Sequence, residues 1–148
     1  MVTISDTRTE ANDVSGDWIT SLLAGAGHVV EGRALVSDDP AAVEKTIRES
    51  AGRTEVIITT GGTGITSRDS TYEAIDRLLD KRLDGFGELF RMLSYEEIGS
   101  AAMLTRACAG TIGRTAIFSL PGSEHAVRLG MTKLILPEIG HVVRELNR

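Results

Sequence analysis

The feature that most constrains the fold is an apolar, β-branched run that leads directly into a cluster of glycines. Residues 55–60 (Glu-Val-Ile-Ile-Thr-Thr) form the run, and residues 61–64 (Gly-Gly-Thr-Gly) follow it. A short apolar run bounded by a turn signal is typical of a strand buried on both faces. Thr71, Ile75 and Leu78 then recur at helical spacing. This order of strand, glycine turn and helix predicts one unit of a parallel α/β sheet.

The remainder of the chain repeats this alternation of β-rich runs and helical patterns. We expect further strands at residues 2–5, 28–36 with an interruption at Gly32, 106–113 in irregular form, and 115–119. We expect helices from Trp18 to about Gly25, from Pro40 to Gly52, over 86–105 with a break near Ser94, and from about Ser123 with an interruption near Pro137. The pattern predicts an α/β fold, a three-layer α/β/α sandwich on a mostly parallel, mixed sheet. A length of 148 residues suits a single domain, 1–148.

Composition argues against several classes of protein. With 16 Lys and Arg against 21 Asp and Glu, the formal net charge is −5, which disfavours a basic nucleic-acid-binding face. Apolar runs such as residues 134–136 are far too short to span a bilayer, and the start of the chain lacks the pattern of a signal peptide. The single cysteine, Cys108, allows neither an internal disulfide nor a multi-cysteine zinc site. We therefore expect a cytoplasmic protein without nucleic-acid or membrane partners.

Four turns follow predicted strands. In open parallel sheets the carboxyl ends of the strands meet at one edge, and ligands bind there. The four turns are residues 5–7 (Ser-Asp-Thr), 37–40 (Ser-Asp-Asp-Pro), 60–69 and 119–123 (Ser-Leu-Pro-Gly-Ser). We expect all four to lie along the same edge of the sheet.

Two aspartates in these turns are candidate functional residues. Pro40 suits the first helical position, which makes Asp39 the expected N-cap and leaves Asp38 without a capping role. Ser70 and the glutamate three residues later have capping-box spacing, which leaves Asp69 one residue outside its helix. The alternative is that each aspartate is itself the cap and the helix starts one residue earlier. The equivalent positions of the two aspartates leave both interpretations open.

The glycine turn is a candidate phosphate site. Its glycines allow unusual backbone angles, and the following helix N-terminus favours an anion. It is not a Walker loop, because the Gly-Lys-Ser/Thr ending is absent, and Ser67 stands where a dinucleotide fingerprint needs its third glycine. The alternative is a plain tight turn. A phosphate beside Asp38 and Asp69 would be repelled, by about 4 kcal/mol for two charges 4 Å apart at an effective dielectric of 20. A bound Mg²⁺ removes that repulsion, so the residues together indicate a Mg²⁺–nucleotide site.

No side chain has the pattern of an activated nucleophile. Ser119 and Ser123 lack nucleophile-elbow spacing, and Cys108 reads as a small packed residue. The three histidines lack metal-ligand spacing, which indicates structural or surface roles for them; they are His28, His125 and His141. Phosphoryl or nucleotidyl transfer fits best, because such reactions depend mainly on positioning and charge stabilisation. Basic candidates for contacting an anionic substrate are Arg68, Arg91 and Arg106, each with ordinary surface pairing as the alternative.

Several ordered segments resemble the MoaB/Mog family of molybdenum-cofactor biosynthesis. The glycine motif of that family resembles Thr59 to Gly64, with Arg68-Asp69, Thr71 and Glu73-Ala74 after it. Further similarity covers residues 2–6, 85–88 with 90–91, and 120–123. Residues 94–101 with 105–107 resemble the MoaB branch in particular. The resemblance extends from residue 2 to about residue 145.

The resemblance implies a molybdopterin-binding fold and an adenylyltransferase that uses Mg²⁺ and ATP. In such enzymes the terminal phosphate of molybdopterin attacks the α-phosphate of ATP, and a partner insertase (a MoeA-like molybdopterin molybdenumtransferase) exchanges the adenylyl group for molybdate or tungstate. The resemblance also implies a homotrimer, or a hexamer in some members. It makes Asp38 and Asp69 the essential aspartates, with Asp69 holding Mg²⁺ and Asp38 positioning ATP or the metal. The residues implied to bind phosphate, nucleotide or pterin are Ser5, Asp6, Thr60, Gly61, Gly62, Thr63, Gly64, Glu88, Ser119, Pro121, Gly122 and Ser123.

This chain departs from the family pattern at a few positions. Ser70 and Tyr72 replace what are often Val and Pro, and Glu124-His125 replaces what is often Pro-Lys, which removes one contact to an anionic substrate. Two alternative functions remain. One is a molybdopterin-binding or partner-binding trimer without catalysis, and the other is a CinA-like nucleotide pyrophosphatase that acts without a pterin. The similarity over residues 94–107 favours the MoaB-type function over the pyrophosphatase.

Overall fold

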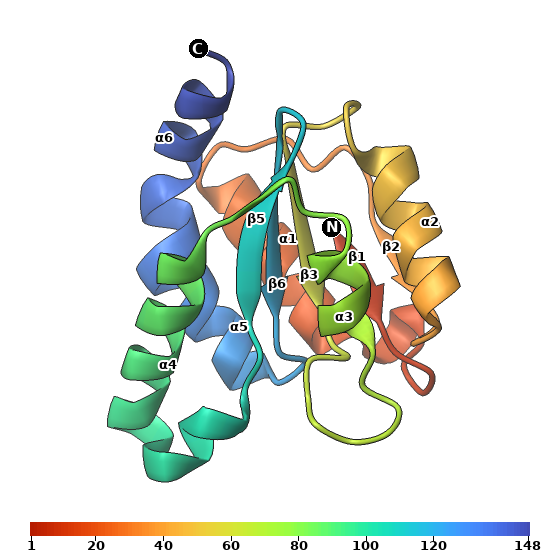
Figure 1. The fold of residues 1–148 in the computed structure, drawn as a ribbon, viewed down its shortest axis with the longest axis vertical. Helices are drawn as coiled ribbons and strands as arrows, with labels where there is room; N and C mark the ends of the chain where they lie inside the picture. The colour runs from red at the N-terminus through yellow and green to blue at the C-terminus, as the bar shows by residue number, and fades with distance from the viewer.

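The computed structural model describes all 148 residues and contains one six-stranded sheet with helices on both faces (Figure 1). The strands are β1 (Val2–Ile4), β2 (Ala34–Val36), β3 (Val56–Thr60), β4 (Lys81–Arg82), β5 (Cys108–Ile112) and β6 (Thr115–Leu120). Their order in the sheet is β2-β1-β3-β6-β5-β4. The first four strands in this order are parallel, β5 is antiparallel to β6, and β4 is antiparallel to β5. The sheet is therefore mixed and mostly parallel, as predicted.

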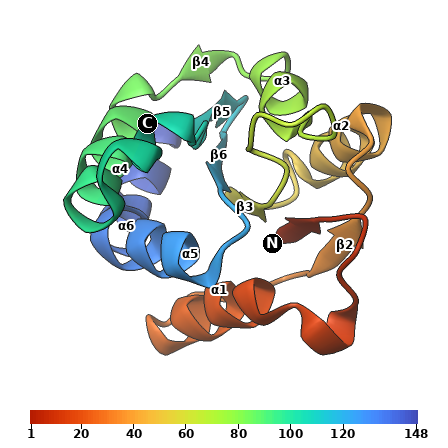
Figure 2. The ribbon, with the colours of Figure 1, turned by 90° about the horizontal axis from the view of Figure 1, so that it is seen from below.

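The helices form the outer two layers. They are α1 (Val14–Gly25), α2 (Pro40–Ser50), α3 (Thr71–Asp76), α4 (Asp84–Ile98), α5 (Glu124–Gly130) and α6 (Leu136–Leu146). Short 3₁₀ turns cover Glu10–Asn12 and Gly99–Leu104, and a π-helical turn covers Met131–Ile135. Figure 2 shows α1, α4, α5 and α6 on one face of the sheet and α2 and α3 on the other. This arrangement confirms the predicted α/β/α sandwich.

The central strands β3 and β6 separate two hydrophobic clusters. Ile58 and Phe118 pack in the cluster that includes residues of α1, α4, α5 and α6. Ile57 and Ile117 pack in the other cluster, with residues of α2 and α3. Successive strand residues point to opposite faces, so a strand covered on both sides needs an unbroken apolar run. This explains why residues 55–60 were the clearest strand signal in the sequence.

Several predicted elements differ in their extent, and the helix expected from Trp18 begins four residues earlier, at Val14. Residues 28–33 are not a strand, and only Ala34–Val36 pairs in the sheet. The reason is that β2 is an edge strand whose one neighbour, β1, is itself three residues long. The break predicted near Ser94 is absent, because this serine is buried inside an unbroken α4. The helix ends instead at Gly99, whose φ of +69° an L-residue rarely adopts.

The interruption predicted near Pro137 takes the form of the π-helical turn Met131–Ile135, which ends where α6 begins. The chain stays helical there, because Pro137 occupies the first turn of α6, where a backbone N–H is not needed for helical hydrogen bonding. The π-helical turn that precedes it accommodates the junction with α5. Strand β4, which pairs with Thr111 and Gly110 of β5, was not predicted, since two charged residues carry no strand pattern. No helix is long and apolar enough to cross a bilayer.

Candidate functional site

The carboxyl ends of β1, β2, β3 and β6 bring the four predicted turns to one edge of the sheet, which Figure 2 views end-on. The backbone N–H of Asp38 donates to Asp6 Oδ1 at 2.9 Å, which joins the turns after β1 and β2. The hydroxyl of Thr60 donates to the carbonyl of Pro121 at 2.9 Å, which joins the turns after β3 and β6. The predicted gathering of the four turns is confirmed.

The glycine turn after β3 packs so closely that its first two positions exclude side chains. Gly61 and Gly62 have φ values of +103° and +66°. A Cβ on Gly61 would lie 2.1 Å from the Ile4 carbonyl oxygen, and one on Gly62 would lie 1.9 Å from Thr71 Oγ1. The backbone N–H groups of Gly62 and Thr63 donate no hydrogen bond within the chain. Two amide donors therefore have no partner within the chain, an arrangement that suits an anion.

Asp38 is not a helix cap. The N-cap of α2 is Asp39, whose Oδ2 accepts a hydrogen bond from the N–H of Ala42 at 2.9 Å. The side-chain hydrogen bonds that Asp38 Oδ1 accepts are long, from the hydroxyls of Ser70 at 3.3 Å and Thr71 at 3.5 Å. Burial raises the pKa of Asp38 above its ordinary value, and the neighbouring charges of Asp69 and Asp6 raise it further. Its surroundings thus disfavour the negative charge unless a cation is added.

Asp69 has a better-defined local role than the sequence suggested. Its Oδ2 accepts hydrogen bonds from both the N–H and the hydroxyl of Thr66, at 2.8 and 2.7 Å. These bonds hold the pKa of Asp69 below its ordinary value, and the charge of Arg106 acts in the same direction. A Cβ on Gly64 would lie 2.6 Å from Asp69 Oδ2, so this carboxylate packs directly against the glycine turn.

The predicted capping box at α3 is wrong. Ser70 is the N-cap residue, but its side chain makes no capping hydrogen bond and contacts Asp38 instead. The carboxylate of Glu73 does not reach back to the helix start, because it pairs with the guanidinium of Arg106. Asp69 lies outside the helix as predicted. Its carboxylate bonds to Thr66 in the preceding loop, and no capping box is involved.

The two aspartates leave oxygen atoms available for a cation. Asp38 Oδ2 and Asp69 Oδ1 accept no side-chain hydrogen bond. No group of three or more His, Cys, Asp or Glu side chains is arranged to hold a metal ion. Two carboxylates without a complete cage fit Mg²⁺, which is commonly bound by one or two carboxylates together with substrate phosphates and water.

Other predicted residues shape the same edge through backbone contacts. The hydroxyl of Ser5 accepts hydrogen bonds from the N–H groups of Thr7 and Arg8, at 3.2 and 3.1 Å, and so fixes the turn after β1. The hydroxyl of Ser123 accepts a hydrogen bond from the N–H of Ala126 and caps α5. The N–H groups of Gly122 and Ser123 donate no hydrogen bond within the chain. The turn after β6 thus offers amide donors like those of the glycine turn.

Two predicted residues are not brought to this edge. Ser119 is fully buried in β6, where its oxygen accepts a hydrogen bond from the hydroxyl of Thr59 at 3.0 Å. Glu88 is exposed on α4 and makes no side-chain hydrogen bond or ion pair. Among the basic candidates, Arg68 is exposed and Arg91 half-buried, both without an ion pair, whereas Arg106 bonds to the loop after the glycine turn.

The sequence analysis missed Arg8 and Asp13. Arg8 Nη2 donates to the carbonyl of Gly122 at 2.7 Å, so this cation lies at the edge of the site. Asp13 is only 2% exposed and accepts hydrogen bonds from the Thr3 hydroxyl at 2.6 Å and Arg33 Nη2 at 3.0 Å. Its position directly before a helix was an available N-cap signal. The place of Arg8 directly after the Ser-Asp-Thr turn was the corresponding signal for this arginine.

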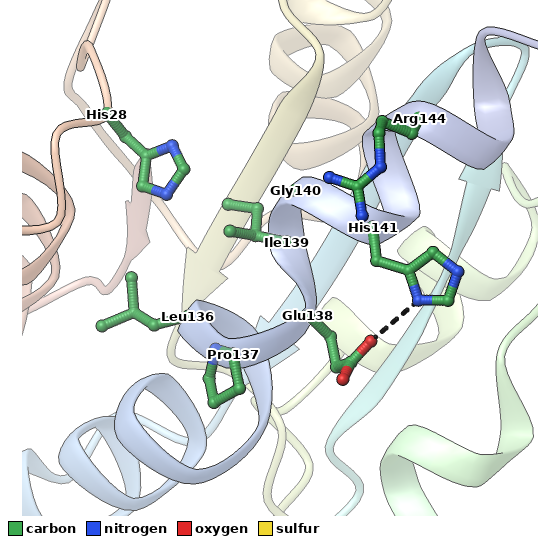
Figure 3. A pocket seen from close by; sticks show the side chains of 8 residues that line it. All are labelled: His28, Leu136, Pro137, Glu138, Ile139, Gly140, His141 and Arg144. Carbon is green, nitrogen blue, oxygen red and sulfur yellow. Dashed lines mark hydrogen bonds and ion pairs between the residues drawn. The ribbon is translucent and has the colours of Figure 1, made fainter.

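A surface pocket lies elsewhere, along α6. It has a volume of about 500 Å³, and Figure 3 shows His28 across from His141 and Arg144 of α6. His141 Nδ1 lies 3.0 Å from a carboxylate oxygen of Glu138. None of the predicted catalytic or binding residues lines this cavity. Burial raises the pKa of the Cys108 thiol to about 12, which disfavours the thiolate form that a nucleophile needs.

Comparison with known proteins places the chain in a family. Residues 1–141 match a family model described as a probable molybdopterin binding domain. The chain is 55% identical to molybdenum cofactor biosynthesis protein B of Bacillus cereus over 151 aligned positions, which cover 100% of this chain and 89% of that protein. A crystal structure of a molybdenum cofactor biosynthesis protein B matches with a TM-score of 0.96 at 55% identity, covering 99% of this chain and 93% of that one.

A more distant structure agrees. The tungsten cofactor synthesizing protein MoaB from Pyrococcus furiosus matches with a TM-score of 0.82 at 40% identity, covering 99% of this chain and 94% of that chain. The edge that carries Asp38, Asp69 and the glycine turn thus belongs to a fold shared along nearly the whole chain. This protein is a member of the molybdopterin-binding domain family, a molybdenum or tungsten cofactor biosynthesis protein of the MoaB type.

Proposed function

We propose that this protein is a molybdopterin adenylyltransferase that transfers AMP from Mg²⁺-ATP to the terminal phosphate of molybdopterin. One observation carries the proposal. Two carboxylates with unused oxygen atoms, Asp38 and Asp69, lie against a glycine turn whose Gly62 and Thr63 N–H groups have no partner in the chain. A donor set of this kind suits a divalent cation and a polyphosphate bound together.

The proposed roles follow from these contacts. The N–H groups of Gly62 and Thr63 bind phosphate oxygens of ATP, and Asp38 and Asp69 hold the Mg²⁺ through their unused oxygens. Bound Mg²⁺ supplies positive charge that offsets the charge of the phosphates. An oxygen of the pterin phosphate forms the new bond to the α-phosphorus of ATP, and the bond to pyrophosphate breaks. A phosphate monoester is largely ionised at neutral pH, so no side chain has to remove a proton from it.

We also propose that the protein is a homotrimer, or a hexamer built from two trimers. Six large apolar side chains of α4 and the following 3₁₀ turn are between 47% and 78% exposed; they are Leu89, Met92, Tyr95, Ile98, Met103 and Leu104. An exposed apolar patch of this kind is typical of a subunit interface. Analytical ultracentrifugation tests this, because Met92→Glu is expected to yield monomers while the exposed α2 variant Lys45→Glu keeps the wild-type assembly.

The decisive experiment mixes the protein with molybdopterin and Mg²⁺-ATP and follows pyrophosphate and adenylylated pterin together. We expect both products, and we expect them to disappear with EDTA and in Asp69→Asn. We propose that adenylylated pterin is then the substrate of a MoeA-like insertase. Adding that enzyme with molybdate or tungstate to the same assay tests this step, because the adenylylated pterin should be consumed.

Two results would contradict the proposal. Binding of molybdopterin without product at saturating Mg²⁺-ATP would favour a binding protein without catalysis. Cleavage of a dinucleotide in the absence of pterin would favour a CinA-like pyrophosphatase.

A further inference from the structure

Arg106 connects both ends of the loop that carries Asp69. This residue lies between the 3₁₀ turn Gly99–Leu104 and strand β5. Its Nε and Nη2 atoms donate to the carbonyl of Gly64, at 2.9 and 2.6 Å. Its Nη2 also donates to the carbonyl of Asp69 at 3.2 Å. One guanidinium therefore joins the start and the end of the loop 64–69.

The other side of the same guanidinium is held by α3. Arg106 Nη1 forms an ion pair with Glu73, and its guanidinium carbon lies 5.2 Å from the centre of the Tyr72 ring. A planar guanidinium presents its donors in a fixed fork, so one orientation satisfies all of these partners. Because Nε, Nη1 and Nη2 are all engaged by the chain, Arg106 is not a free cation facing a substrate.

The loop has few contacts of its own that would keep its shape. Within it, the N–H of Asp69 donates to the carbonyl of Thr66 at 3.1 Å, and the Asp69 carboxylate bonds back to Thr66. Residues 65–68 are exposed, and Ile65 is 65% exposed. A short exposed loop with only local bonds is expected to be mobile unless a side chain from outside holds it.

We propose that Arg106 is a positioning residue that closes the loop 64–69 and thereby fixes the Asp69 carboxylate against the glycine turn. Glu73 holds Arg106 in this orientation. The inference rests on the proposed function for its catalytic consequence, although the closure of the loop is a property of the chain alone. It differs from the expectation that Arg106 contacts a substrate phosphate.

Hydrogen exchange tests the loop without any need for activity. In Arg106→Ala and Arg106→Lys we expect faster exchange of the loop's hydrogen-bonded amides, those of Thr66 and Asp69, since neither variant can bridge Gly64, Asp69 and Glu73 together. The matched control is Arg77→Ala, which removes a surface arginine of the same region that pairs with Glu44 and does not touch the loop. Unchanged exchange of the Thr66 and Asp69 amides in a folded Arg106→Ala protein would overturn the proposal.

Kinetics separate positioning from substrate binding. Displacing a reacting group by about 1 Å can cost about 100-fold in rate, so we expect kcat to fall by that order in Arg106→Ala. We expect the Mg²⁺ concentration for half-maximal rate to rise and the KM for molybdopterin to stay within about threefold. Glu73→Gln should show the same pattern to a smaller extent. A large rise in the KM for molybdopterin with unchanged kcat would make Arg106 a substrate ligand and overturn the proposal.

The two proposals fail separately. A wild-type protein without transferase activity whose loop still loosens in Arg106→Ala would contradict the proposed function and support the loop closure. Full activity with unchanged loop exchange in Arg106→Ala would contradict the loop closure and leave the proposed function standing.

Discussion

Asp13 and Asp38 are both aspartates close to the start of a helix, yet their surroundings shift their pKa values in opposite directions. Burial alone would raise the pKa of Asp13, but hydrogen bonds from Thr3 and Arg33 hold it below its ordinary value. Burial raises the pKa of Asp38, and the nearby carboxylates of Asp69 and Asp6 add to that effect, against weak hydrogen bonds from Ser70. The first carboxylate has its cation within the chain, and the second does not.

This difference separates a carboxylate that stabilises the fold from one available for chemistry. Asp13 accepts short hydrogen bonds and caps α1 through the N–H of Gly16 at 3.1 Å. Asp38 costs folding free energy, because its charge is partly desolvated and repelled. Groups that a fold holds in an unfavourable state concentrate at functional sites. The comparison therefore favours Asp38 as a functional residue on physical grounds independent of any relative.

The largest effect should come from Asp38→Asn. We expect adenylyl transfer to fall by about 100- to 1,000-fold, since removing one preorganised group that stabilises charge in the transition state typically costs this much. Thermal stability should be unchanged or slightly higher, because repulsion with Asp69 and Asp6 is relieved. The assay follows pyrophosphate release beside a thermal melt. Asp39→Asn is the matched control, as asparagine is an equally good N-cap. Loss of stability with full activity in Asp38→Asn would mean that Asp38 stabilises the fold and does not act in the reaction.

Asp13→Asn should have the converse effect. We expect a loss of about 2 kcal/mol in the free energy of unfolding, because the change removes the charge of a carboxylate that is 2% exposed and accepts hydrogen bonds from Thr3 and Arg33. Urea denaturation measures it. Asp17→Asn is the control, since Asp17 pairs with Arg33 from a side chain that is 60% exposed and should cost less than about 1 kcal/mol. Equal stability of the Asp13→Asn and wild-type proteins would mean that Asp13 is not structural.

The pH dependence of the free energy of unfolding should differ between the wild-type protein and Asp13→Asn. A carboxyl whose pKa is lowered on folding stabilises the native state fully above its unfolded pKa of about 3.9, and this contribution is lost as the pH falls through the folded pKa. The stability gap between wild type and Asp13→Asn should therefore be constant from neutral pH down to about pH 5 and shrink below about pH 4. Denaturation curves at several pH values measure the gap. A gap that widens on acidification would contradict the lowered pKa of Asp13.

The smallest expected effect is on stability and comes from an uncharged polar group, the hydroxyl of Thr105. The hydroxyl of Thr105 is buried and has no hydrogen-bond partner. We expect Thr105→Val to raise the free energy of unfolding by about 1 kcal/mol, since an unpaired buried polar group costs about 1–3 kcal/mol. Thr115→Val is the control and should destabilise, because that hydroxyl donates to the Thr54 carbonyl at 2.8 Å and accepts from the Gly52 N–H at 3.0 Å. Destabilisation by Thr105→Val would show that its hydroxyl has a partner in the assembled protein.

Sequence patterns were sufficient where one local rule decides the outcome. The apolar run at residues 55–60 and the glycines after it predicted β3 and its turn, because burial on both faces and positive φ values each need particular residue types. The Asp39-Pro40 pair predicted the start of α2, because an N-cap needs a side-chain acceptor and the first helical turn tolerates proline.

Patterns failed where a distant residue decides. Glu73 has capping-box spacing but pairs with Arg106, which is 33 residues away in the chain. The side chains of Thr3 and Arg33 that hold Asp13 come from other parts of the fold. A residue whose role is set by such partners is hard to identify from local spacing alone. For this reason the sequence left Arg106 open between contact with an anionic substrate and ordinary surface pairing, and the structure places it against the loop after the glycine turn.

The two edges of the sheet bear on how copies of the chain can associate. One edge is β4, two charged residues long, and the other is β2, three residues long. Short and charged edge strands are poor templates for the addition of further strands. Neither edge is therefore suited to continue the sheet from one molecule into the next, which protects the protein against fibre-like growth. The proposed homotrimer or hexamer would therefore form through the helical surfaces.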